Sequence, residues 1–174
     1  MNEKKLIKAT FAGGCFWCMQ LPFQQVKGVI SAVSGYAGGT EENPTYEEIS
    51  FGRTGHLEAV QVTYDPETVS YETLLNVFWM QIDPTDNAGQ FADRGSQYRT
   101  AVFWHDEEQK RMAEASKRAL DDSGRFARPV ATLILPYTTF YPAEEYHQNY
   151  ATKHPREYGR YKKYSGRERF IESN

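Results

Sequence analysis

The order of strand-like and helix-like segments constrains the fold of this chain more than any other feature of its sequence. Apolar side chains recur at or near the two-residue period typical of half-buried strands over residues 5–12, 29–35, 57–65 and 100–104. The period changes at residues 71–82, where apolar side chains behind the N-cap candidate Ser70 follow the spacing of an amphipathic helix. The pattern therefore predicts alternating strands and helices.

Two further helices and one more strand complete the predicted order. A short helix is expected at residues 15–20, before Pro22, a longer helix at 106–122 and a strand at 130–136. The resulting order is βαββαβ followed by αβ. It is typical of an α+β fold with a ferredoxin-like, split βαβ sheet, a helical layer and additional C-terminal elements.

The chain is expected to form one domain. Its 174 residues are enough for one core and too few for two. Residues 1–174 are therefore predicted to be a single domain, which ends from about residue 155 in a basic, tyrosine-rich and solvated tail. Residues 83–99 form a long segment of glycine, proline and polar residues, and loops of this length inside a domain are often functional.

Composition and charge exclude several classes of protein. The net charge of −3 argues against a surface that binds nucleic acid. No stretch approaches the roughly 20 apolar residues of a membrane helix, and Lys8, Gly13 and Gly14 interrupt what would otherwise imitate a signal peptide. Two cysteines are too few for a secreted disulfide scaffold. We therefore expect a soluble cytoplasmic protein that binds neither nucleic acid nor a membrane.

Both cysteines, Cys15 and Cys18, lie in the stretch FAGGCFWCMQ. If Cys15 stands where the glycine turn meets the first helical turn, backbone N–H groups and the helix dipole favour its thiolate, a nucleophile. Cys18, one turn further on, can then reach a sulfur oxidised at Cys15. A zinc half-site is the main alternative, but the histidines are not paired at ligand spacing, so no metal is expected. A structural disulfide would close a minimal loop and is disfavoured.

One carboxylate is predicted to face the core. In the strand at residues 57–65, Glu58 shares its face with Val60, Val62 and Tyr64, which is the more apolar face. Desolvation there would raise the pKa of Glu58 towards neutrality and keep the carboxyl protonated. A buried acid of this kind is a candidate proton donor, and a purely structural role is equally open from the residues alone.

Several motifs together resemble one enzyme family. GGCFWC, GYAGG, NPTYEEIS, TGHLEAVQVTYDP, FWMQIDPTDNAGQFADRGSQYRT and FYPAEEYHQNY occur in the expected order over about 150 residues, and they resemble the peptide-methionine (S)-S-oxide reductases of the A type. The resemblance implies a ferredoxin-like fold, no cofactor, and reduction of methionine (S)-sulfoxide, free or in oxidised proteins, with thioredoxin as the reductant.

The resemblance also assigns roles. Cys15 is the attacking thiolate and Glu58 the acid, which the chemistry requires because a sulfoxide is a poor electrophile until its oxygen is protonated or hydrogen-bonded. The other matched positions are an apolar pocket for the substrate methyl group (Phe16, Trp17), two hydroxyl donors (Tyr46, Tyr98), a polar residue that holds substrate and water (Asp93), and a histidine near the site (His147).

The chain departs from the family pattern in its thiols. Many relatives carry resolving cysteines in a C-terminal tail, whereas this tail has none, and Ser50 stands where the family often has a cysteine. Cys18 is therefore the only thiol that can resolve an oxidised Cys15. Two rival functions remain at this point: a thioredoxin-type dithiol oxidoreductase, and a module that binds methionine-rich segments without turnover.

Overall fold

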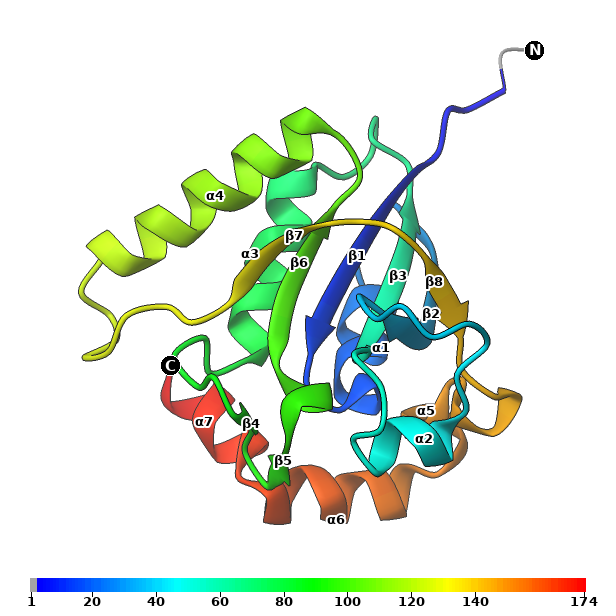
Figure 1. The fold of residues 1–174 in the computed structure, drawn as a ribbon. Coiled ribbons are helices and arrows are strands. Elements are labelled where there is room, and N and C mark those ends of the chain that lie inside the picture. The colour runs from blue at the N-terminus through cyan, green and yellow to red at the C-terminus, as the bar shows by residue number, and fades with distance from the viewer. Residues whose placement is uncertain (1–2) are drawn as a thin grey trace.

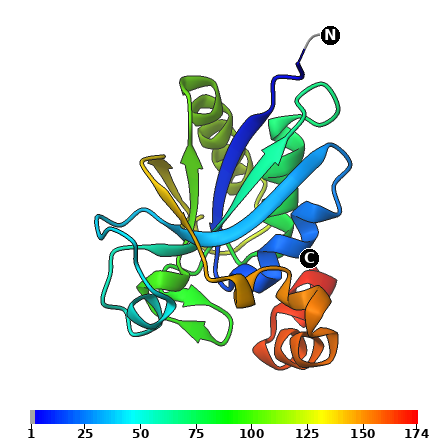
Figure 2. The ribbon, with the colours of Figure 1, turned by 90° about the vertical axis from the view of Figure 1, so that its right-hand side faces the viewer.

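The computed structural model describes residues 3–174, in which a six-stranded mixed sheet is covered by helices (Figures 1 and 2). The strand order is β7-β6-β1-β3-β2-β8. The strands are β1 (Ile7–Gly13), β2 (Val29–Ala37), β3 (Leu57–Tyr64), β6 (Thr100–Trp104), β7 (Leu133–Pro136) and β8 (Phe140–Pro142), and a separate small ladder pairs β4 (Gly89–Gln90) with β5 (Asp93–Arg94).

The helices begin where the sequence supplies caps. The Ser70 side chain accepts a hydrogen bond from the Thr73 N–H at the start of α3, and Thr45 and Glu48 form a capping box at the start of α2. The α-helices are α1 (Phe16–Gln24), α2 (Tyr46–Ser50), α3 (Tyr71–Gln81), α4 (Glu107–Asp122), α5 (Tyr150–Lys153), α6 (Pro155–Ser165) and α7 (Arg167–Ser173), with short 3-10 turns η1 (Ser96–Tyr98) and η2 (Glu145–His147).

The four central strands interleave two crossover units. Helix α1 joins β1 to β2, and β3 lies between these two strands and antiparallel to both. Helix α3 joins β3 to β6, and β1 lies between those two strands and antiparallel to both. The predicted α+β class is confirmed. The predicted order βαββαβ holds for β1, α1, β2, β3, α3 and β6, but the short helix α2 between β2 and β3 and the β4–β5 ladder before β6 were not predicted. The strand predicted at residues 130–136 is shorter in the structure, because only residues 133–136, which form β7, pair with β6, and they do so in parallel.

The two faces of the sheet carry different cores. Val60 and Val62 of β3 pack with α1 and α3, which lie on the far face of the sheet in Figure 1. Leu57 and Ala59 point to the other face, where residues 133–140 cover them. The alternation predicted for this strand is therefore confirmed, and it places Glu58, which is 3% exposed, on the side of α1.

The C-terminal segment differs from the solvated tail that the sequence predicted. Residues beyond 155 form α6 and α7, which run below the end of β1 at which α1 begins (Figure 1). Tyr158 and Arg167 are buried against the rest of the chain. The expectation of a solvated tail was wrong. Although α6 and α7 are polar on average, the buried side chains of Tyr158 and Arg167 hold them against the rest of the chain.

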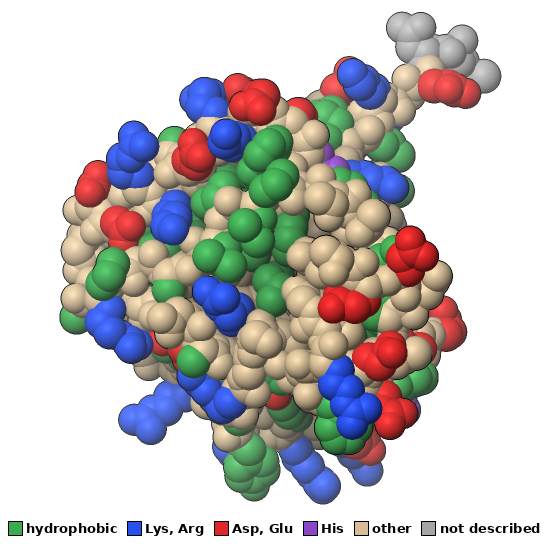
Figure 3. Space-filling view, viewed as in Figure 1, with side chains coloured by type: hydrophobic (Ala, Val, Ile, Leu, Met, Phe, Trp, Pro, Cys, Tyr) green, Lys and Arg blue, Asp and Glu red, His purple; other side chains and the backbone are tan. Residues whose placement is uncertain are grey.

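The surface carries both signs of charge. Figure 3 shows basic and acidic side chains intermingled over α4. Among residues 3–174 the structure contains no helix that is long and apolar enough to cross a membrane.

The close approach of β8 to β2 gives a test of the fold. A Cβ at Gly35 would collide with the Tyr141 carbonyl oxygen and the Phe140 ring. Gly35→Ala is therefore expected to lower the free energy of unfolding by about 1 to 3 kcal/mol. Gly159, in α6, has no atom within 4 Å of its Cβ position, so Gly159→Ala is the control and should stabilise slightly. Urea denaturation measures both, and equal effects would contradict this account.

Candidate active site

The first turn of α1 places the two thiols. Cys15 is the N-cap residue of α1, as the sequence predicted, and the Cys18 N–H donates to the Cys15 carbonyl oxygen at 3.1 Å. Both side chains are buried, and neither is in a disulfide. The two sulfur-bearing residues are thus one helical turn apart on a rigid element.

The two glycines before Cys15 are required by packing. Gly14 has a φ of +80°, and a Cβ there would lie 2.7 Å from Gln90 Cβ and 2.8 Å from Arg167 Nη2. A Cβ at Gly13 would lie 2.6 Å from Met19 Sδ. The turn into α1 is therefore surrounded so closely that side chains are excluded at both positions.

Glu58 enters the same region from β3. Its partner in the neighbouring strand β2 is Tyr36, and the Phe16 backbone N–H donates to its carboxyl. Burial, helped by the nearby Asp93 carboxyl, raises the pKa of Glu58 well above its ordinary value. The predicted rise in the pKa of Glu58 on burial is therefore confirmed. Within residues 3–174, Oε2 of Glu58 has no hydrogen-bond partner, which leaves one polar atom available to a bound molecule.

The thiols titrate differently from the sequence expectation. Burial raises the pKa of Cys15 well above its ordinary value, and the charges of Cys18, Glu58 and Asp93 act in the same direction. The predicted resting thiolate at Cys15 was therefore wrong, because desolvation outweighs the helix N-terminus. The pKa of Cys18 falls to about 7, chiefly because the Cys15 thiol donates a hydrogen bond to it.

Six of the nine residues named from the sequence line a pocket of about 50 Å³, whereas Cys18, Phe16 and His147 lie outside its lining. Burial raises the pKa of Tyr46 to about 12 and also raises that of Tyr98, so both hydroxyls stay protonated and can donate. A larger hollow of about 600 Å³ beside β2 contains neither thiol and not Glu58. The smaller pocket is the candidate site, and it is lined by Cys15, Trp17, Tyr46, Glu58, Asp93, Tyr98 and Tyr161.

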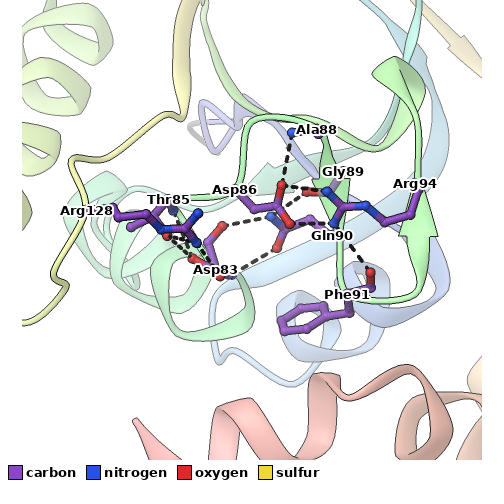
Figure 4. A network of polar contacts seen from close by, with 9 residues as sticks. All are labelled: Asp83, Thr85, Asp86, Ala88, Gly89, Gln90, Phe91, Arg94 and Arg128. Carbon is purple, nitrogen blue, oxygen red and sulfur yellow. Dashed lines mark hydrogen bonds and ion pairs between the residues drawn. The ribbon is translucent and has the colours of Figure 1, made fainter.

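A network of polar contacts fixes the loop that supplies Asp93 and Tyr98 (Figure 4). Arg94 donates two hydrogen bonds to the Asp86 carboxylate, at 2.5 and 3.0 Å. The Gln90 side chain bonds the backbone N–H and carbonyl of Asp83 at 2.9 and 2.8 Å. These contacts connect the start of the predicted functional loop to its middle, and Asp93 on β5 lines the same pocket as Cys15.

The two aromatic residues between the cysteines point in different directions. Trp17 is half-buried and lines the pocket, whereas Phe16 is 1% exposed and packs in the core beneath it. The indole Nε1–H of Trp17 donates to His147 Nδ1 at 3.2 Å, and its ring stacks on Tyr150 at 3.7 Å between centroids. His147 does not line the pocket. Burial lowers the pKa of His147, which favours the neutral ring. Its Nδ1 atom fixes the Trp17 indole by accepting this hydrogen bond outside the pocket.

Two residues of α6 complete the site and were missed from the sequence. The Tyr161 hydroxyl donates to the Asp93 carboxylate, and its ring meets Trp17 edge-on at 6.0 Å. Tyr158 packs against both cysteines. Their spacing of three residues on one helix face was the available signal, and the interpretation of this segment as a solvated tail hid it.

Two adjacent thiols beside a protonated carboxyl place the protein among thiol-dependent oxidoreductases. Residues 7–174 match the family model described as peptide methionine sulfoxide reductase. The curated peptide methionine sulfoxide reductase MsrA of Bacillus licheniformis is 55% identical over 174 residues, which cover 100% of this chain and 96% of the relative. The peptide methionine sulfoxide reductase MsrA of Halalkalibacterium halodurans is 57% identical over 169 residues, which cover 97% of this chain and 96% of the relative.

The fold agrees with a solved relative. The crystal structure of reduced Mxr1 from Saccharomyces cerevisiae matches with a TM-score of 0.82 at 31% identity, covering 89% of each chain. The chain therefore belongs to the peptide methionine sulfoxide reductase family.

The raised pKa of Cys15 is testable in Cys18→Ser, which leaves one thiol. Because burial disfavours the anion, thiolate absorbance should rise with a midpoint above the ordinary value of about 8.5. The same variant unfolded in urea is the control and should titrate at the ordinary value. A folded midpoint at or below the unfolded one would restore the sequence expectation of a stabilised thiolate.

Proposed function

We propose that this protein reduces the S epimer of methionine sulfoxide, free or within oxidised proteins, to methionine. Family membership and the name shared by its relatives support this reaction. The observation that carries the proposal is the convergence of Cys15, Glu58 and two tyrosine hydroxyls on one small pocket. A nucleophilic sulfur, an acid and hydroxyl donors are the groups that sulfoxide reduction needs.

The first half-reaction transfers oxygen to Cys15. The sulfoxide oxygen accepts hydrogen bonds from Tyr46 and Tyr98 while the Glu58 carboxyl gives it a proton. The Cys15 sulfur bonds to the substrate sulfur. The protonated oxygen then moves from the substrate sulfur to the Cys15 sulfur as the S–S bond breaks, which leaves a sulfenic acid on Cys15. The thiol proton of Cys15 replaces the proton given by Glu58, so that methionine leaves and the carboxyl is restored.

The aromatic wall selects the substrate. Trp17 presents its indole to the pocket and is fixed by His147 and Tyr150, so an apolar surface meets the methyl end of the side chain. Phe16 supports this wall from the core, and Tyr161 extends it edge-on while its hydroxyl donates to Asp93. We assign Asp93 to holding substrate and water.

The second half-reaction makes a Cys15–Cys18 disulfide, which thioredoxin reduces. Attack of the Cys18 sulfur on the sulfenic acid forms the S–S bond and releases the oxygen as water. Cys15 and Cys18 are the only cysteines of the chain and are one turn apart, so a disulfide within the chain can form only between them. A reductant of the thioredoxin class acts in the reducing cytoplasm, where we place the protein.

The fold proposals rest on connectivity. We assign the central order β6-β1-β3-β2 to the ferredoxin-like plan, because two split βαβ units interleave there. We also propose that residues 1–174 act as a single domain, since Arg167 of α7 donates to the Gly13 carbonyl at the end of β1.

Separated sulfoxide epimers test the reaction. The wild-type protein with thioredoxin should release methionine from the S epimer only. Cys18→Ser should release one equivalent per protein and stall with a trappable sulfenic acid, because no second thiol resolves it. Cys15→Ser should release none. Binding of the sulfoxide without any methionine from the wild-type protein would instead establish a binding module, and turnover of Cys18→Ser at the wild-type rate would remove Cys18 from the cycle.

The role of Glu58 is tested by a single turnover. Glu58→Gln keeps the size of the side chain and cannot give up a proton, so methionine release should fall on the order of 10²-fold. In the wild-type protein the rate should fall as rising pH removes this proton, with a midpoint above that of an ordinary carboxyl, because burial raises the pKa of Glu58. Glu67→Gln changes an exposed carboxyl just beyond β3 and is the matched control. A rate equal to that control would exclude Glu58 as the acid.

A further inference from the structure

Arg167 is the largest fully buried side chain of the described structure, at 1% exposure. It lies at the start of α7, directly after Gly166, and its guanidinium reaches the turn that precedes Cys15. A buried cation is costly unless an opposite charge or a full set of hydrogen bonds compensates it. Its position therefore calls for a physical reason.

The hydrogen bonds of Arg167 do not neutralise its charge. Nη1 donates to the Gln81 carbonyl at 2.7 Å and Nη2 to the Gly13 carbonyl at 3.0 Å. Within residues 3–174 no carboxylate forms an ion pair with it, and Nε has no partner. The Phe91 ring covers the group at 4.8 Å. The positive charge thus remains available to groups around it.

The guanidinium lies between the segments that flank the two thiols. It bonds Gly13, two residues before Cys15, and Nη1 is 3.8 Å from Sδ of Met19, which directly follows Cys18. The charge of Arg167 favours the anionic form of Cys18, of Glu58 and of Asp93. Of these three, Cys18 is the group whose pKa is lowered, whereas burial raises the other two.

We propose that Arg167 is a positioning residue for the second half-reaction: its buried guanidinium holds the Gly13–Gly14 turn and stabilises the anionic sulfur of Cys18. The inference rests on the proposed function. In the step it serves, the Cys18 sulfur attacks the Cys15 sulfur, the S–S bond forms, and the S–O bond breaks. The oxygen leaves as water, with one proton taken from the buried Glu58 carboxyl that lines the pocket.

Every charged or titratable group around Cys18 enters this balance. Cys15 donates a hydrogen bond from α1 and Tyr158 donates one from α6, and both favour the Cys18 anion. Asp93 on β5 opposes it, as does burial. The charge of Cys18 in turn raises the pKa of Glu58 on β3. Arg167 supplies the positive charge in this set, which is why its removal should be visible in the pH dependence.

The test separates the two half-reactions in a single turnover. In Arg167→Met, which keeps the stem and removes the charge, disulfide formation at neutral pH should slow about tenfold, and its pH midpoint should rise by about one unit. Methionine release should change far less. Arg167→Lys, which keeps the charge, should restore the midpoint. Arg169→Met, an exposed arginine two residues along α7, is the matched control and should behave as the wild type.

A second measurement does not depend on the substrate. The thiolate absorbance of Cys18 is titrated in Cys15→Ser, with Cys15→Ser/Cys18→Ser as the blank, and adding Arg167→Met should raise the midpoint by about one unit. Should this variant fail to fold, Arg167→Gln, an uncharged donor, carries the same expectation. An unchanged Cys18 midpoint, with both half-reactions slowed equally, would make Arg167 a scaffold residue only and overturn the proposal. Absence of methionine from the wild type would instead refute the proposed function.

Discussion

Desolvation of two acidic groups, the Glu58 carboxyl and the Cys15 thiol, is the constraint on which the rest of the site depends. Burial raises the pKa of both, because it favours the neutral, protonated form of each group over the charged form. Reduction of a sulfoxide requires a proton donor at its oxygen and a nucleophilic sulfur at its sulfur atom. A neutral carboxyl and a neutral thiol can supply these without creating separated charges in a site shielded from water. Tyr46 and Tyr98, which line the pocket, are half-buried, and burial raises the pKa of both hydroxyls, so they stay protonated and can donate.

The short segment from β8 to His147 connects the edge of the sheet to two walls of the pocket. Strand β8 pairs with β2, and Glu144, just beyond it, accepts hydrogen bonds from the Tyr36 hydroxyl at 3.0 Å and from the Tyr46 N–H at 3.2 Å. Three residues later, His147 holds the Trp17 indole. Displacing β8 would therefore disturb the hydroxyl of Tyr46 and the apolar wall together, because both depend on the same backbone.

Local patterns in the sequence predicted much of the site, whereas contacts between distant residues were missed. The alternation in β3 was sufficient to place Glu58 inside with a raised pKa, and the glycine pair was sufficient to place Cys15 at a helix start. Strand β8 was missed because three residues carry no periodic signal. The upward shift of the Cys15 pKa and the docking of α6 and α7 were missed. Both depend on burial by residues distant in the sequence, which a short stretch of sequence does not reveal.

The pKa shifts of the two thiols are linked by the hydrogen bond that Cys15 donates to Cys18. Burial and this bond raise the pKa of Cys15, which also faces the carboxyls of Glu58 and Asp93, whereas the bond lowers the pKa of Cys18, with help from the charge of Arg167 and the hydroxyl of Tyr158. In the proposed mechanism the first step uses neutral groups and the second an anionic sulfur, so the C-terminal helices serve the second step. Because the same guanidinium bonds the carbonyls that end β1 and α3, docking of α7 and activation of Cys18 are a single structural event.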